Sequence, residues 1–103
     1  MEINEFARMS YERSKSNETG RFDWEFYTIA MAGECGELLN TLKKVKRKDF
    51  PLDKERFGEE VADVITYAMI LLMELGIDPQ KAIMGKYEKV NNRLKKGGFH
   101  IRE

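Results

Sequence analysis

The sequence lacks several features, and each absence narrows the class of protein. It has a single cysteine, Cys35, so no disulfide can form within the chain, and we expect a reducing compartment, the cytoplasm. Lys plus Arg and Asp plus Glu both total 18, so the formal net charge is zero. A generic nucleic-acid or membrane-surface binder normally has an excess of basic residues, so neither partner is expected.

Long hydrophobic runs are also missing. The longest nearly uninterrupted apolar run, VITYAMILLM, is about half the length that a membrane-spanning helix needs. No basic segment followed by an apolar stretch opens the chain, so we expect no signal peptide. At 103 residues, the chain 1–103 is expected to form one domain.

The residues that are present favour helices. Charged residues make up 35% of the chain, only two prolines occur, and no segment alternates with the period of a strand. Asp53 and Asp78 are candidate N-caps, Pro79 suits a first helical turn, and Gly76 suits the end of a helix. The pattern predicts an all-α, four-helix bundle-type fold with helices at about 2–17, 24–48, 53–75 and 79–95, followed by a short C-terminal tail.

The third predicted helix is apolar in almost every direction. A helix that is apolar nearly all round is buried nearly all round, and three short neighbours cannot enclose it completely. We therefore expect a second copy of the chain to cover the remaining face, in a homo-oligomer that is a dimer or a tetramer. The residues of this helix that support the argument are Val61, Val64, Ile65, Ala68, Met69, Ile70, Leu71, Leu72 and Leu75.

Two pairs of acidic residues occupy positions where core residues are expected. Glu34 and Glu37 are three apart in MAGECGELLNTLKK, so on a helix they point within about 60° of each other. Glu60 and Asp63 repeat this spacing in GEEVADVITY. Both pairs are edged by core residues, so the two helices can bring them together from opposite sides. Glu2 and Glu5 show the same spacing but are expected to be solvated. Glu59 points about 100° away from Glu60 and is expected to be either a surface residue or a group that contacts the acids from outside.

Four inward carboxylates would repel one another and be costly to desolvate, by several kcal/mol for each ion. Protonation, basic partners or a divalent cation would relieve this cost. Oxygen ligands select hard cations, so Mg²⁺ is expected, with Mn²⁺ as a possible substitute. A di-iron site would need Glu-x-x-His pairs, and the only histidine, His100, lies in the tail.

Three quoted segments resemble one known family. AGECGELLNTLKKVKR, GEEVADVITYAMILLMELGID and KYEKVNNR, within residues 24–94, are similar to the MazG-like all-α nucleoside triphosphate pyrophosphatases. That superfamily includes dimeric dUTPases, dCTP pyrophosphatases and phosphoribosyl-ATP pyrophosphohydrolases. Its hallmark is E-x-x-E followed, after a variable gap, by E-x-x-D, which matches Glu34, Glu37, Glu60 and Asp63 here.

The resemblance implies a hydrolase that cleaves a (deoxy)nucleoside triphosphate between the α and β phosphates, giving the monophosphate and pyrophosphate, in nucleotide-pool house-cleaning. It implies that the four acids hold Mg²⁺ and act in catalysis, with one acid or a bound water as nucleophile. The family also has a late K…[N/S]…R pattern, matched by Lys86, Asn92 and Arg93, with Asn91 as the adjacent option; these residues are expected to contact phosphate or sugar.

A base pocket would need an aromatic ring. Trp24 resembles an aromatic position of some deoxycytidine-specific relatives, and Tyr67 follows Asp63 by one helical turn, so both are candidates, with core packing as the alternative. The basic cluster KKVKRK is expected to be a solvated helix end. Two other functions stay open: a non-catalytic helical module that binds a nucleotide or a protein, and a phosphoribosyl-ATP pyrophosphohydrolase.

Overall fold

The computed structural model describes residues 1–16 and 22–96, and these form four helices. The helices are α1 (Ile3–Ser16), α2 (Trp24–Lys46), α3 (Lys54–Glu74) and α4 (Pro79–Lys95). No strand occurs in the described part of the chain, so the all-α prediction is confirmed, and each helix begins and ends within two residues of its predicted range. The predicted C-terminal tail lies outside the described residues. No helix of the described segments is long and apolar enough to span a bilayer.

The helix boundaries are set by local chemistry. The carboxylates of Asp23, Asp53 and Asp78 each accept a hydrogen bond from a backbone N–H three residues later and so cap α2, α3 and α4. Gly76 follows α3 with a φ of 71°, a left-handed conformation that glycine adopts without strain. The caps predicted at Asp53 and Asp78 and the helix end at Gly76 are therefore confirmed.

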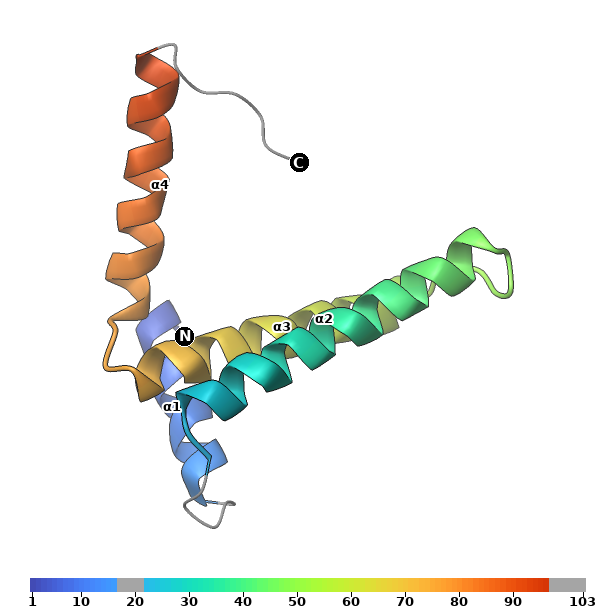
Figure 1. Ribbon diagram of the computed structural model, residues 1–103, viewed down its shortest axis with the longest axis horizontal. Coiled ribbons are helices and arrows are strands. Elements are labelled where there is room, and N and C mark those ends of the chain that lie inside the picture. The colour runs from blue at the N-terminus through green and yellow to red at the C-terminus, as the bar shows by residue number, and fades with distance from the viewer. Residues whose placement is uncertain (17–21, 97–103) are drawn as a thin grey trace.

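The helices do not form one closed bundle (Figure 1). α2 and α3 lie side by side as an antiparallel pair, and α1 packs across α3. α4 contacts α1 and α3 but shares no contact with α2 among the described residues, and it projects away from the α2–α3 pair. The chain is thus an assembly of packed helices, as predicted, whereas the four-helix bundle-type arrangement is not confirmed within a single chain.

The direction of α4 is fixed at its first turn. Asn4 of α1 donates from Nδ2 to Oδ1 of Asp78 over 3.0 Å, and its Oδ1 accepts from the backbone N–H of Gln80 over 2.9 Å. Pro79, between these two contacts, is buried. Both polar ends of one α1 side chain are therefore attached to the start of α4.

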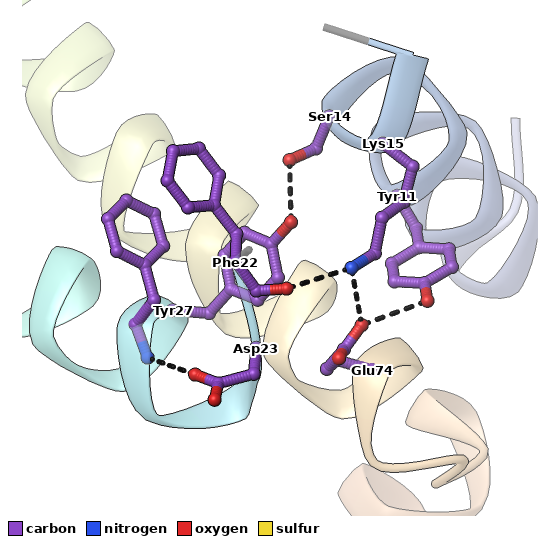
Figure 2. A network of polar contacts seen from close by, with 8 residues as sticks. Tyr11, Ser14, Lys15, Phe22, Asp23, Tyr27 and Glu74 are labelled. Carbon is purple, nitrogen blue, oxygen red and sulfur yellow. Dashed lines mark hydrogen bonds and ion pairs between the residues drawn. The ribbon is translucent and has the colours of Figure 1, made fainter. Parts of the chain in front are cut away.

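A second polar cluster joins α1, α2 and α3 (Figure 2). Lys15 Nζ lies 3.0 Å from the Glu74 carboxylate, donates to the carbonyl of Phe22 over 3.0 Å, and lies over the rings of Tyr11 and Tyr27. Tyr27 is almost fully buried, and its hydroxyl is 3.0 Å from Ser14 Oγ. The cluster holds the start of α2 against the last turns of α1 and α3.

Large apolar faces stay uncovered in the single chain. On α3 only Met69 and Ile70 are buried, while Ile65, and Leu75 directly after the helix, are exposed. On α4 an apolar stripe is open, with Ile83, Tyr87 and Leu94 exposed by 39%, 60% and 53%. Exposed large apolar side chains therefore lie on both α3 and α4.

Candidate functional site

One face of α2 and one face of α3 meet along their length and carry the acidic pairs. A step of three or four residues returns a helix to the same side, so Glu34, Glu37, Thr41 and Lys44 follow one another along α2. The hydroxyl of Thr41 donates to Oε2 of Glu60 on α3 over 3.1 Å. The two helices run antiparallel and rise by the same distance for each residue. The Thr41–Glu60 pair therefore places Lys44 opposite Phe57 towards one end and Glu34 opposite Tyr67 towards the other.

Glu34 is influenced by all three of the other acids. A hydrogen bond with the Glu37 carboxyl is the largest cause that raises the pKa of Glu34 above its usual value. Partial burial adds to the shift, and the negative charges of Glu37, Asp63 and Glu60 follow. The four carboxylates predicted from sequence therefore act on one another across the α2–α3 interface.

Glu60 has one oxygen without a partner. Its Oε2 accepts from Thr41, but Oε1 is buried and makes no hydrogen bond. A buried acceptor left unsatisfied costs about 1–3 kcal/mol, so native proteins rarely contain one without a reason. A hard cation is one ligand that would satisfy this oxygen, and the four carboxylates are the donor set that Mg²⁺ prefers.

The side-chain positions do not define a coordination sphere. Among residues 1–16 and 22–96, no group of three or more His, Cys, Asp or Glu side chains is arranged to hold a metal ion. Glu34 and Glu60 are half-buried, whereas Glu37 and Asp63 are exposed. The acids thus share a face and an electrostatic environment, and further convergence would need rotation of their side chains.

Tyr67 lies beside the acidic face, which is the side of α2 and α3 that carries Glu34, Glu37, Glu60 and Asp63. It lines a cavity of about 280 Å³ between α1 and α3, together with Asp63. The other lining residues are mostly polar and come from both helices: Ser10, Arg13, Ser14, Thr66 and Ile70. The structure therefore places Tyr67 and Asp63 in one cavity, as expected from their spacing on α3.

Trp24 lies far from the acids. It is the first residue of α2, is 49% exposed, and stands ten residues before Glu34, which is about 15 Å of helix. It does not line the cavity that contains Tyr67. Within one chain the two candidate base-pocket residues are not brought together.

Lys86, Asn92 and Arg93 are exposed on α4. α4 has no contact with α2 among the described residues and projects away from the α2–α3 pair, so the helix that carries these residues lies apart from the helix that carries Glu34 and Glu37 (Figure 1). The phosphate contacts expected of them would need a different arrangement of α4 or a second copy of the chain.

The fold brings two polar residues of α1 to the cavity that contains Asp63, and the sequence pattern did not predict either of them. Ser10 of α1 is buried, and no sequence pattern around it indicated a polar contact. Arg13 of α1 lines the cavity that contains Asp63 and follows Ile3, Phe6 and Met9 at helical spacing. A basic residue in an otherwise apolar stripe is the signal that could have identified it.

Comparison of the chain with protein-family models, with curated proteins and with solved structures finds no match. The assignment of a function therefore rests on the residues and the geometry described above.

Proposed function

We propose that the chain is a Mg²⁺-dependent nucleoside triphosphate pyrophosphohydrolase that works in the cytoplasm on the nucleotide pool. The observation that carries the proposal is that Glu34 and Glu37 of α2 share a face with Glu60 and Asp63 of α3. The pKa of Glu34 is raised first by its hydrogen bond with Glu37, then by partial burial, and then by the charges of Glu37, Asp63 and Glu60. The resemblance of these segments to the MazG-like pyrophosphatases supports the same reaction.

The reaction adds water across the anhydride between the α and β phosphates. The hydroxyl bonds to one phosphorus, the bond from that phosphorus to the bridging oxygen breaks, and the other fragment leaves with the electron pair. Bound Mg²⁺ would neutralise phosphate oxygens that the carboxylates alone would repel. Glu34 and Glu60, half-buried on facing helices, and the exposed Glu37 and Asp63 would hold it.

The protein residues have separate tasks in this reaction. Thr41 donates a hydrogen bond to Oε2 of Glu60, which leaves Oε1, buried and without a hydrogen bond, available to a ligand. One of the four carboxylates that does not bind the metal would take up the proton released from water. Tyr67 offers a ring beside Asp63 against which a base or sugar would pack.

The active form is a homo-oligomer. The exposed apolar stripe of α4 and the partly covered α3 support this, since a second copy would bury both. Gly33 and Gly36 on α2 also face open space, because a Cβ added at either would meet nothing within 4 Å. A second chain packed on these faces would supply Lys86, Asn92 and Arg93 to the acids.

Substitution of the acids on α3 tests the proposal. Glu60→Gln and Asp63→Asn should each reduce pyrophosphate release from a nucleoside triphosphate in Mg²⁺ by more than about 100-fold. Glu59→Gln, next to Glu60 and exposed, is the matched control and should keep wild-type activity. Circular dichroism would verify that helical content is unchanged, and full Mg²⁺-dependent activity in both α3 variants would refute the assignment.

One observation favours a second function. No group of three acids in the described part of the chain is arranged to hold a metal, which suits a binding module that has kept the fold without turnover. Calorimetry with Mg²⁺ and a nucleotide separates the two, because the module would bind the nucleotide tightly and leave it intact.

A further inference from the structure

A second cavity lies at the turn between α2 and α3, next to the acidic face. Its volume is about 380 Å³, and Thr41 and Lys44 of α2 and Arg56 and Phe57 of α3 line it. Phe50 and Pro51 of the connecting loop close it on one side. The cavity therefore sits between two helices whose relative position the Thr41–Glu60 hydrogen bond fixes.

Thr41 joins this cavity to the acids. Its hydroxyl donates to Glu60, while the same residue lines the cavity. Along α3, Arg56 precedes Glu60 by one helical turn, and along α2 Lys44 follows Thr41 by nearly one turn. A ligand held at the acids could thus extend directly into the cavity.

Two cations and one carboxylate are among the residues that line the cavity; Arg56 is exposed, whereas Lys44 differs in burial from its neighbours on α2. Lys44 is half-buried, whereas Lys43 and Lys46 on the same helix are exposed. Arg56 supplies a second cation, and a guanidinium and an ammonium together are typical phosphate ligands. Asp53 also lines the cavity, but its Oδ1 already accepts from the backbone N–H of Arg56 as the cap of α3.

We propose that this cavity binds the terminal two phosphates of the substrate, which leave as pyrophosphate, with Lys44 and Arg56 as their ligands. The proposal rests on the proposed function. It gives the substrate a direction along α3: the base or sugar lies near Tyr67, the bond to be cleaved lies at Glu60 and Asp63, and the leaving group lies at Arg56. From Arg56 to Tyr67 the helix rises by about 16 Å, enough for an extended nucleoside triphosphate.

The arrangement also assigns phosphate cations within a single chain. Lys86 and Arg93 lie on α4, which has no contact with α2 in the described structure. Lys44 and Arg56 lie next to the acids whether or not a second copy is bound. The basic cluster KKVKRK is thus divided, with Lys44 directed to the cavity and Lys43 and Lys46 to solvent.

The test is calorimetric titration of inorganic pyrophosphate with Mg²⁺ into the full chain. Lys44→Ala and Arg56→Ala should each weaken pyrophosphate binding about tenfold, because each removes a charge-assisted contact. Affinity for a nucleoside monophosphate should stay within about twofold of wild type. Lys43→Ala and Lys54→Ala, exposed and outside the cavity, are the matched controls and should bind pyrophosphate as wild type does.

Three results would overturn the assignment: a wild-type chain that does not bind pyrophosphate with Mg²⁺, a Lys44→Ala/Arg56→Ala double variant that binds it as tightly as wild type, or an equal loss of monophosphate binding in that variant. If the alanine variants lose helical content, Lys44→Gln and Arg56→Gln repeat the test with longer side chains. Two results together would refute the proposed function and leave the cavity assignment standing: the wild-type chain hydrolyses no nucleotide, and the double variant no longer binds the pyrophosphate that wild type binds.

Discussion

Glu60→Gln should be more stable than wild type without a metal and less stable than wild type when Mg²⁺ is bound. In wild type, Glu60 Oε1 is buried without a partner and shares its face with three other acids. The glutamine keeps an oxygen that can accept from Thr41, loses the negative charge, and gains an amide N–H₂ that can donate to neighbouring carboxylates.

The expected magnitude in metal-free buffer follows from the unsatisfied oxygen. A buried acceptor without a partner costs about 1–3 kcal/mol, so relief of part of this cost should raise the free energy of unfolding by about 1 kcal/mol. For a domain of this size that corresponds to an increase in Tm of about 4–8 °C. Glu59→Gln, exposed one position earlier, should leave Tm unchanged.

Addition of Mg²⁺ should reverse the order. A ligand that binds only the folded state at ten times its Kd adds about 1.4 kcal/mol to wild type, and this gain should be absent or much smaller in Glu60→Gln. Differential scanning calorimetry with EDTA and then with a Mg²⁺ series measures both effects. The reasoning fails if Glu60→Gln is less stable than wild type in EDTA, or if Mg²⁺ stabilises wild type and the variant equally.

Three further predictions concern other parts of the molecule. Because the folded pKa of Glu34 is raised, the folded state binds more protons than the unfolded state above pH 4.5; in metal-free buffer this contribution to stability is complete below pH 4.5 and is lost as the pH rises through the folded pKa. Glu34→Gln should remove that part of the pH dependence in a series of urea unfolding curves, and an unchanged slope would contradict it. Lys15→Met should cost about 1–3 kcal/mol in urea unfolding because it leaves Glu74 without its ion pair; no measurable loss would show that the cluster is not stabilising. Tyr87→Glu should shift the oligomer towards monomer in light scattering, whereas the exposed Lys89→Glu should not, and equal masses for both variants would place the interface elsewhere.

The helices could be predicted because their determinants are local. Asp53 and Asp78 cap helices through contacts three residues away, and Gly76 ends α3 by its own conformational freedom. The helical period alone placed Glu34 beside Glu37 and Glu60 beside Asp63. These features need no knowledge of how one helix packs on another.

The position of α4 could not be predicted in this way. This position depends on the side chain of Asn4, which makes hydrogen bonds with Asp78 and Gln80, 74 and 76 positions later in the chain. An amphipathic stripe such as Ile83 to Leu94 shows that a helix will be covered, but not whether the cover comes from its own chain.

The role of individual cations was equally hidden. Lys43, Lys44 and Lys46 are indistinguishable by composition, and only the alignment of α2 with α3 separates Lys44 from the others. Arg13 reaches the cavity beside Asp63 because α1 crosses α3, which no pattern within α1 reveals.

The central claim is that the four acids support cleavage between the α and β phosphates. It is tested most directly by ³¹P NMR of a panel of canonical and modified nucleoside triphosphates incubated with the wild-type chain and Mg²⁺ or Mn²⁺. The account predicts a nucleoside monophosphate and pyrophosphate in equal amounts, formed only when the metal is present. A nucleoside diphosphate with inorganic phosphate, or no turnover of any nucleotide in the panel, would contradict it.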